Sequence, residues 1–531
     1  MGRTRPLLIP LALWIAALAC GGPAPAATTE ALRPPSTTTP SRVPVPSGRM
    51  ILGIEYAPAE LAEHFRESGA TSAKPYPSVG DWQNVQSGPD AAYDWSGLDR
   101  FVRAYQEAGF EHLTLMITAR TLWAAIEPLR LGDAGDVFPR PEYEDDYAAY
   151  VQALVERYDL DGSDDMPGLL YPVTLFGFEP EYSSYWPGEA ETYIRLLELA
   201  RPAVRAANPE AQVMAAGLLM TDVFDGYPTP AEIEARMLDP DPRIWYKSPE
   251  DVALLLDHPE LFDVLDVHSL GDYTEVPPTI AWVRAEMAER GYERPIWIGD
   301  SFGGTGLNGW GPAACPLRPN SGWLGHPATE ADRCRVAEAL NALADNSGAD
   351  HDQAIAWIRG ETAAGIVRKV VVAAGEGVAG INIGNVEDWE PLMLTLGGAG
   401  TSPWQGMVDR NMLTREFYGY RPGYYALTQV AEVIHAYDSV ERLDLGDDHI
   451  YVYRFVLDDG RTVIVAWADT GLYLPGEVMA TRPIQVPVGT DSPVRLEWTV
   501  TSGSEPVVEA LTPENGEVTV EVGQVPAFVW P

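Results

Sequence analysis

Two stretches of the chain, Leu175-Phe176-Gly177-Phe178-Glu179-Pro180-Glu181 and Pro295-Ile296-Trp297-Ile298-Gly299-Asp300, carry its clearest structural signal. Each begins as a short apolar run, which is typical of a buried strand, and then meets a carboxylate. Parallel strands that form a barrel present their polar groups together at their C-terminal ends. The two stretches therefore predict a parallel sheet that gathers Glu179 and Asp300 at one end.

Short apolar runs alternate with longer amphipathic segments through most of the chain, a pattern that favours repeated βα units. The candidate strands are 51–55, 112–118, 173–178, 212–216, 262–268, 295–299 and 378–383, with a weaker one at 79–85. The candidate helices are 96–108, 146–158, 189–207, 279–290 and 353–374. Eight strands with their helices fit a (β/α)8 TIM barrel. An open doubly wound sheet is the alternative, but no glycine-rich nucleotide loop follows the first strand.

The N-terminus is interpreted as a targeting segment. A basic start precedes an apolar stretch, 7–19, that is too short to span a bilayer comfortably. It ends in Ala17-Leu18-Ala19-Cys20, which resembles a bacterial lipoprotein signal with Cys20 as the lipidated residue; an ordinary secretory signal is the alternative. Residues 21–48, rich in Pro, Thr, Ala and Ser, predict a disordered tether. We expect a cell-surface lipoprotein or a secreted protein, outside the cytoplasm.

The pattern changes after a last helix predicted at 425–437. Short strand-like runs follow, separated by turn signals such as Asn-Gly and Ser-Gly, and they predict a small antiparallel β-sandwich. The predicted organisation is a signal peptide (1–20), a tether (21–48), a barrel (49–436) and a C-terminal β domain (437–531).

Composition narrows the choice of partners and chemistry. The formal net charge is −41, from 77 acidic and 36 basic residues, which argues against nucleic acid and against an electrostatically bound membrane surface. Contact with a membrane is expected only through the N-terminal lipid. In an exported protein, Cys315 and Cys334 form an even pair and predict a disulfide bond. No metal site, cofactor or thiol chemistry is expected, because the His residues do not cluster in the sequence and neither of these cysteines adjoins a plausible base.

Several motifs occur in an order that is similar to that of the retaining (β/α)8 glycoside hydrolases. They are Tyr93-Asp94-Trp95-Ser96-Gly97-Leu98-Asp99, Phe178-Glu179-Pro180, Val264-Leu265-Asp266-Val267-His268 and Arg421-Pro422-Gly423-Tyr424-Tyr425-Ala426-Leu427. That clan carries one catalytic Glu after strand four and another at the end of strand seven. The resemblance implies that Glu179 is the acid/base, that Asp300 stands at the position of the nucleophile, and that the substrate is a carbohydrate.

The chain departs from the clan at two positions. Asp300 is one methylene shorter than the usual Glu, and a misplacement on that scale can cost about a hundredfold in rate. A shifted strand could restore contact, a widened site could admit a water nucleophile, or catalysis could be lost. Phe178 stands where the clan has an Asn that hydrogen-bonds the sugar 2-hydroxyl.

Other side chains near the predicted site are candidates for substrate contact or for a substitute carboxylate. His268 could hydrogen-bond a ligand or Asp300. The aromatic candidates for stacking on sugar rings are Trp389, Trp186 and Trp123, and the candidate acids are Glu181, Glu55, Glu387 and Asp388. Core packing or a solvated loop charge is the plainer explanation for each of these residues.

The sequence thus predicts a surface-anchored glycoside hydrolase that cleaves O-glycosidic bonds of an oligo- or polysaccharide with two carboxylates. A catalytically inactive, carbohydrate-binding barrel is the first alternative, and an envelope scaffold with a vestigial cleft is the second. Carboxyl groups about 5–5.5 Å apart would indicate a retaining site, and groups about 6.5–9.5 Å apart an inverting one.

Overall fold

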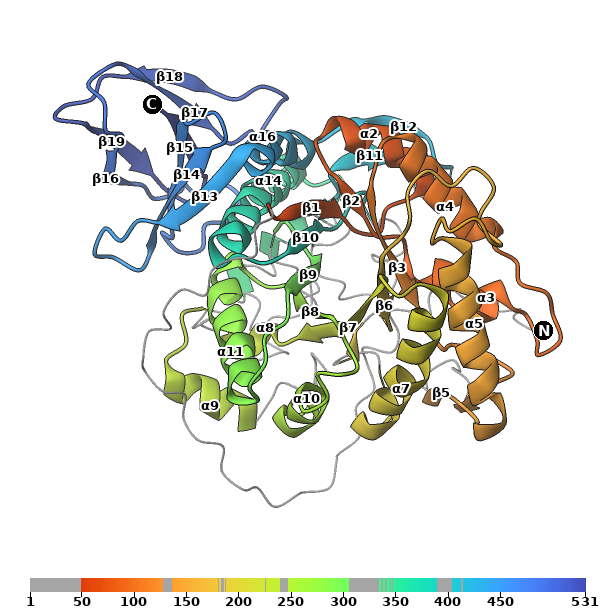
Figure 1. Cartoon of the computed structure of the whole chain (residues 1–531). Helices are drawn as coiled ribbons and strands as arrows, with labels where there is room; N and C mark the ends of the chain where they lie inside the picture. Colours follow the sequence, from red (N-terminus) through yellow and green to blue (C-terminus); the bar gives the residue numbers. More distant parts are fainter. Residues whose placement is uncertain are drawn as a thin grey trace, which may run out of the picture.

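The structure of the chain is a computed structural model (Figure 1). It describes residues 49–127, 136–179, 181–182, 186, 188–224, 226–238, 247–304, 334–335, 338–339, 341–343, 345, 347–388, 404–411 and 414–531. Cys20, the predicted tether, Cys315 and Trp389 therefore lie outside the described residues. The lipid anchor and the disulfide bond stay predictions.

A closed barrel of eight parallel strands forms the larger part of the molecule, and it confirms the predicted fold class. Its strands are β1 (Ile51–Ile54), β2 (Ser72–Ala73), β3 (His112–Ile117), β6 (Leu175–Phe178), β7 (Gln212–Leu219), β8 (Val264–Ser269), β9 (Ile296–Ser301) and β10 (Gly380–Ile383). They follow one another around the barrel in chain order, and β10 pairs with β1 to close it. The segments that end in Glu179 and Asp300 are the fourth and seventh of these strands.

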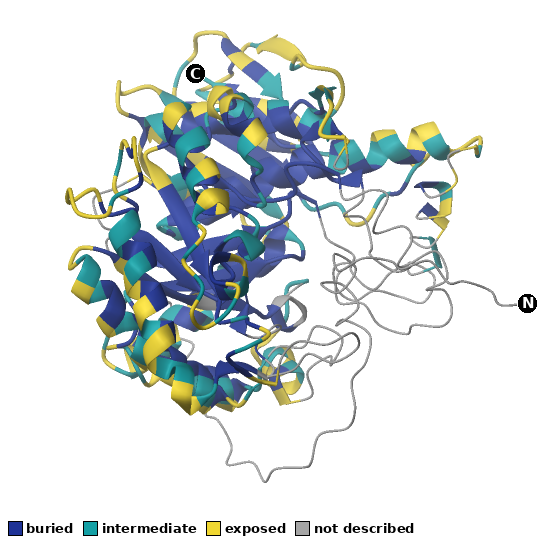
Figure 2. Cartoon of the chain, turned by 90° about the vertical axis from the view of Figure 1, so that its right-hand side faces the viewer, coloured by how far each residue is buried: buried dark blue, intermediate teal, exposed yellow. Residues whose placement is uncertain are grey.

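Helices surround the barrel, with their buried faces turned toward the strands (Figures 1 and 2). The longer helices are α4 (Ser96–Glu107), α5 (Glu144–Arg157), α7 (Ala190–Ala207), α9 (Pro230–Leu238), α10 (Pro249–Leu256), α11 (Val276–Glu289), α14 (His351–Glu376) and α16 (Pro422–Ala436). Short elements are α2 (Ala62–Glu67), α3 (Trp82–Val85), α8 (Thr221–Phe224) and the hairpins β4 (Ala125–Glu127) with β5 (Asp136–Pro139) and β11 (Val408–Arg410) with β12 (Phe417–Tyr420). None of the described helices combines the length and apolarity that a membrane span requires.

The second strand of the barrel is not where the sequence placed it. Residues 79–85 contribute to a 3-10 turn (Pro77–Gly80) and to α3, whereas the strand itself is only Ser72–Ala73. Trp82 and Val85 are buried and lie three residues apart, which is the spacing of one helical turn. A strand of two residues is too short to show an alternating pattern, so the sequence could not reveal it.

The interior of the barrel changes from apolar to charged along its axis. One end is filled by Met116, Leu175, Met214, Val264 and Trp297. Further along β8 and β9, Asp266 accepts a 2.8 Å hydrogen bond from the backbone N–H of Gly299. Period-two alternation then places charged groups at the C-terminal ends of the strands, where barrels carry their sites.

A C-terminal β-sandwich follows α16 directly. Its strands are β13 (Tyr437–Arg442), β14 (Ile450–Leu457), β15 (Thr462–Ala468), β16 (Arg482–Pro487), β17 (Val494–Trp498), β18 (Val508–Leu511), β19 (Glu517–Val522) and β20 (Ala527–Trp530). A six-stranded sheet, β13-β14-β15-β20-β17-β18, packs against the β16-β19 pair over a valine-rich core. This domain confirms the predicted architecture.

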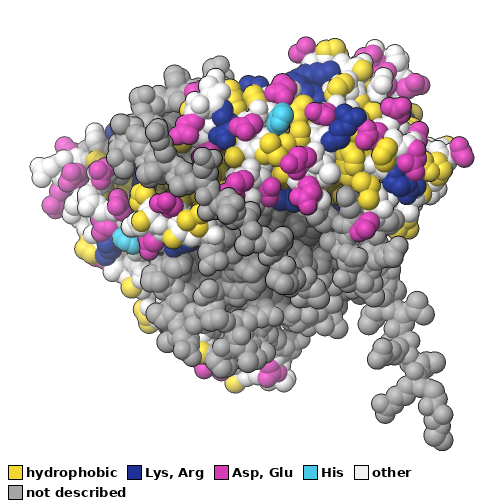
Figure 3. All heavy atoms as spheres, turned by 90° about the horizontal axis from the view of Figure 1, so that it is seen from below, with side chains coloured by type: hydrophobic (Ala, Val, Ile, Leu, Met, Phe, Trp, Pro, Cys, Tyr) yellow, Lys and Arg dark blue, Asp and Glu magenta, His cyan; other side chains and the backbone are white. Residues whose placement is uncertain are grey.

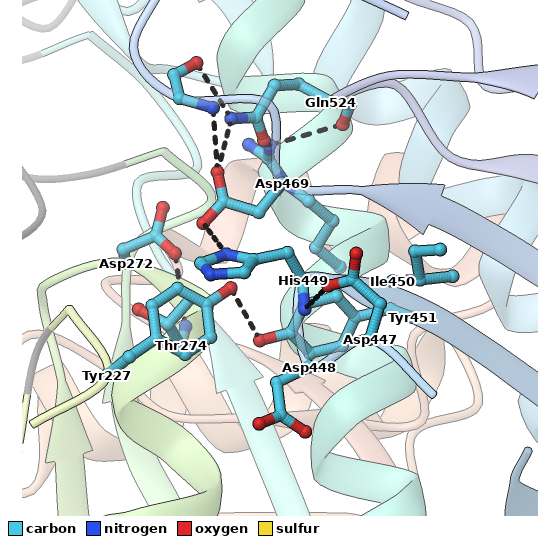
Figure 4. A network of polar contacts seen from close by, with 12 residues as sticks. Tyr227, Asp272, Thr274, Asp447, Asp448, His449, Ile450, Tyr451, Asp469 and Gln524 are labelled. Atoms are coloured by element: carbon cyan, nitrogen blue, oxygen red, sulfur yellow. Dashed lines mark hydrogen bonds and ion pairs between the residues drawn. The ribbon is translucent and has the colours of Figure 1, made fainter. Parts of the chain in front are cut away.

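A network of polar contacts joins the sandwich to the barrel (Figure 4). Tyr451 of β14 donates a 2.9 Å hydrogen bond to the hydroxyl of Tyr227 on the barrel side. Gln524 accepts a 2.7 Å hydrogen bond from Arg368 of α14 and donates to Asp469. Because aromatic residues of β14 and β15 also share one hydrophobic core with the barrel helices, the two domains are packed as a unit.

Acidic side chains are scattered over the described part of the surface seen in Figure 3, with fewer basic ones between them. This distribution agrees with the strongly negative net charge. It favours solubility and does not by itself indicate a function.

Candidate active site

Three buried side chains at the C-terminal ends of the strands form the centre of the candidate site. One ligating atom each of Glu181, His268 and Asp300 lies within 4.8 Å of the other two. Glu181 follows β6, His268 is in β8 and Asp300 is in β9, and each is no more than 5% exposed. The structure therefore brings Asp300 together with Glu181, which the sequence had offered only as a substrate contact or a substitute acid.

His268 lies between two carboxylates. Its Nδ1 is 2.6 Å from Glu181 Oε1, and its Nε2 is 3.2 Å from Asp266 Oδ2. Burial alone would lower the pKa of His268, but the two carboxylates outweigh it and raise the pKa well above its ordinary value. The ring is thus an imidazolium that donates both N–H groups. Both ring nitrogens therefore carry a proton and donate a hydrogen bond. A metal ion binds an unprotonated ring nitrogen, so these residues do not fit a metal ion at His268.

Gly217 of β7 makes room for that imidazole. A Cβ at this position would lie 2.0 Å from His268 Nε2. The orientation of His268 therefore depends on a residue without a side chain on the neighbouring strand.

Burial raises the pKa of Glu181, and the hydrogen bond with His268 opposes this shift. The hydrogen bond holds the carboxyl group in place, while burial favours its protonated form.

A local irregularity of β9 turns Asp300 toward the site. Trp297 faces the barrel interior, and a Cβ on Gly299 would lie 2.3 Å from Asp266, so strict alternation would send Asp300 outward. The register between β8 and β9 instead shifts, and His268 pairs with Asp300. Such a bulge re-aims a side chain. The hydroxyl of Tyr56 then donates a 2.7 Å hydrogen bond to Asp300 Oδ2.

Glu55 and Lys74, at the ends of β1 and β2, form a buried ion pair beside Asp300. Lys74 also donates a 2.7 Å hydrogen bond to the carbonyl of Gly299. Burial and the nearby charge of Asp300 raise the pKa of Glu55 well above its ordinary value. From the sequence, Glu55 is only one of several candidates for a substitute acid.

Sequence reasoning missed Tyr56, Lys74 and Asp266 as members of this site. One signal was available for Asp266. Side chains alternate between the two faces of a strand, so Asp266 and His268, two residues apart, lie on the same face of β8. Nothing comparable marked Tyr56 or Lys74, because they lie beyond the ends of β1 and of the two-residue β2.

Glu179 lies in a different environment. The backbone N–H of Ala119 donates a 2.7 Å hydrogen bond to its Oε1, and the side chain is fully buried. Burial raises the pKa of Glu179 to about 7; Arg120 and the Ala119 N–H oppose the shift, and Asp81 adds to it. The backbone of Glu179 has a φ of 63°, so the chain leaves the extended conformation there. Its catalytic role stays a prediction.

Phe178 does not face the site. Its side chain is fully buried in the main hydrophobic core, and its carbonyl accepts a 3.0 Å hydrogen bond from Tyr193. The side chain at position 178 therefore does not take the place of an Asn that hydrogen-bonds a sugar.

The two described tryptophan candidates are packed against other aromatic rings. Trp186 is only 2% exposed, and its indole N–H donates a 3.0 Å hydrogen bond to Thr192, so the structure gives this ring a packing role; its contact with a sugar stays a prediction. Its apolar bulk packs against Tyr193 instead. Trp123 is half-buried, and its ring lies 4.7 Å from that of Trp82.

Glu387 and Asp388, which follow β10, are engaged in ion pairs. Glu387 pairs with Arg410, and Asp388 pairs with Arg421. Asp388 also accepts a 2.8 Å hydrogen bond from the backbone N–H of Gly406. These contacts give both acids a structural role in holding the segment that follows β10.

Solved structures with a similar fold include several named as glycoside hydrolases. A family 39 glycoside hydrolase from the gut symbiont Bacteroides cellulosilyticus WH2 has a TM-score of 0.56 and 13% sequence identity, over 91% of this chain and 81% of that one. A glucosidase from Croceicoccus marinus (TM-score 0.51, 13% identity) and a monomeric beta-xylosidase from Caulobacter crescentus CB15 (TM-score 0.50, 14% identity) each match over 91% of this chain and 95% of theirs.

At these identities the likeness establishes the fold alone. The sequence matches no protein-family model and no curated protein. The assignment of an activity must therefore rest on the geometry of the site.

Proposed function

We propose that the protein is a glycoside hydrolase that cleaves O-glycosidic bonds of an oligo- or polysaccharide with Asp300 and Glu181. The observation that carries the proposal is the approach of their carboxylate oxygens to within 4.8 Å at the C-terminal end of the barrel. This approach is closer to the separation of about 5–5.5 Å in retaining enzymes than to the 6.5–9.5 Å that admits a water in inverting ones. The fold of the solved neighbours supports the same assignment.

In this proposal Asp300 is the nucleophile and Glu181 is the acid/base. Asp300 attacks the anomeric carbon as the glycosidic bond breaks, and the leaving oxygen takes the proton of Glu181. Water then attacks the glycosyl ester, Glu181 accepts a proton from it, and Asp300 is released as a carboxylate. Burial favours the protonated form of Glu181, as the first step requires, and His268 holds its carboxyl group in place.

Glu179, only two residues away, is the competing acid that the sequence resemblance favours. The matched variants Glu181→Gln and Glu179→Gln separate the two, because each removes one proton donor and changes little volume. Both are assayed beside Asp300→Asn on a panel of aryl glycosides and glycans.

We expect Glu181→Gln to lower turnover by about 10²–10⁴-fold and Glu179→Gln to stay within about tenfold of the parent protein. The reverse ranking would transfer the acid role to Glu179. A parent protein that binds glycans and turns none over would instead be a carbohydrate-binding barrel without catalysis.

The proposal includes export and a lipid anchor at Cys20, supported by the N-terminal sequence. The expected location is the cell surface, where polymeric carbohydrate is accessible. A Cys20→Ala variant should leave the membrane fraction in a fractionation experiment, and one that stays membrane-bound would exclude lipidation as the anchor.

A further inference from the structure

Two buried carboxylate oxygens in the site, one of Glu55 and one of Asp300, have no N–H or O–H donor among the described residues. Glu55 is 1% exposed and Asp300 is 3% exposed. Within the described residues, Glu55 Oε2 and Asp300 Oδ1 accept no hydrogen bond from an N–H or O–H group. The two side chains are nevertheless within hydrogen-bonding reach of one another. Two ionised carboxylates cannot form such a bond, whereas one proton between them satisfies both oxygens.

The charges around this pair favour retention of a proton. The groups that face it are Lys74, Glu181, His268 and Tyr56, with Asp266 behind His268. Four buried carboxyl groups thus share two buried cationic side chains. Full ionisation would leave uncompensated negative charge, which a buried site stabilises poorly.

The position of Lys74 determines which oxygen carries the proton. Lys74 pairs with Glu55 Oε1, so that oxygen acts as the acceptor. The other oxygen, Oε2, is buried and has no N–H or O–H donor, so it is the oxygen left for a proton shared with Asp300.

We propose that Glu55 and Asp300 hold one proton between them, carried by Glu55, and that Glu55 is a positioning residue for the nucleophile. The role in catalysis rests on the function proposed above, whereas the proton pair itself does not. Asp300 then remains a carboxylate that accepts from Glu55 at Oδ1 and from Tyr56 at Oδ2. These two donors, Glu55 and Tyr56, hold the Asp300 side chain in a single orientation. That side chain is one methylene shorter than the usual Glu.

Infrared difference spectroscopy of the full chain at neutral pH tests the pair without any assay of activity. Subtracting the spectrum of Glu55→Gln from that of the parent protein should reveal a protonated-carboxyl band that the variant lacks. Asp300→Asn should lose the same band, because without the charge of Asp300 Glu55 ionises against Lys74. Glu179→Gln, which alters a separate buried acid, should keep it. A band that persists in both Glu55→Gln and Asp300→Asn would overturn the proposal, as would its absence from the parent protein.

Kinetics test the positioning role. Glu55→Gln keeps an N–H donor toward Asp300, so its kcat should stay within about tenfold of the parent value, whereas Glu55→Leu removes the donor and should lower kcat about a hundredfold with a smaller change in KM. Equal losses in the two variants, or no loss in either, would contradict that role. If the parent protein turns over no glycoside, the proposed function fails, and the infrared result still decides the proton pair.

Discussion

Nδ1 of His268 lies 2.6 Å from Oε1 of Glu181, and Nε2 of the same ring lies 3.2 Å from Oδ2 of Asp266. One imidazolium thus links a carboxyl group at the end of β6 to one inside β8. This link orients Glu181 toward Asp300 and supplies part of the positive charge that a buried group of acids requires.

Replacing His268 by Gln should destabilise the fold. The change leaves Glu181 and Asp266 without their shared cation, and removing one partner of a buried ion pair typically costs about 3–5 kcal/mol. The folded-state pKa of His268 is raised, so its contribution is full below the unfolded pKa of about 6.5 and is lost as pH rises through the higher folded value. Urea unfolding at several pH values measures this. His258→Gln, at a partly exposed pair with Glu260, is the control and should change stability by less than about 1 kcal/mol.

Replacing Glu179 by Gln should change the free energy of unfolding more favourably at high pH than at low pH. The pKa of Glu179 is raised from 4.5 to about 7, so the parent protein loses stability as pH rises between these values. Gln does not titrate in this range. The free energy of unfolding of the Gln variant, relative to that of the parent protein, should therefore rise by up to about 3 kcal/mol between pH 4 and pH 8. Chemical unfolding of both proteins across this range checks the slope. The exposed Glu63→Gln should run parallel to the parent, and a Glu179→Gln curve that did so as well would contradict the prediction.

Replacing Gly217 by Ala should disturb the site through His268. The new Cβ would lie 2.0 Å from Nε2, so the imidazole must move away from Asp266 or β7 must shift. We expect a loss of about 1–3 kcal/mol in unfolding free energy together with reduced glycoside turnover. In Gly97→Ala the nearest contact would be an ordinary 3.8 Å, and this control should be neutral in both measurements.

Replacing Arg368 by Met should weaken the junction between the domains. Arg368 is 2% exposed, pairs with Glu361 and donates a 2.7 Å hydrogen bond to Gln524. Its loss removes the cation beside the half-buried Glu361 and the donor to Gln524, and we expect about 3–5 kcal/mol less stability, with calorimetric unfolding at a lower Tm. The exposed Arg454→Met, which breaks a surface pair with Glu441, should cost less than about 1 kcal/mol. Equal effects of the two changes would show that the junction does not depend on Arg368.

The sequence by itself determined the order of the βα units, the position of the sandwich and the approximate place of the site. Apolar runs such as 175–178 and 296–299 mark strands because their burial is a local property of the pattern. The carboxylates that follow them mark the C-terminal ends of strands four and seven for the same reason.

Only the tertiary structure decided which carboxylates meet. The turn at Glu179, with its φ of 63°, interrupts the alternation after β6; Glu181 lies beside Asp300, whereas Glu179 accepts a hydrogen bond from the backbone of Ala119. The shifted register between β8 and β9 turns Asp300 inward although Gly299 faces the same interior. Glu55 enters the site because the barrel closes and brings the end of β1 beside β9. These are contacts between different strands of the barrel, and no local pattern encodes the register or the backbone turn that creates them.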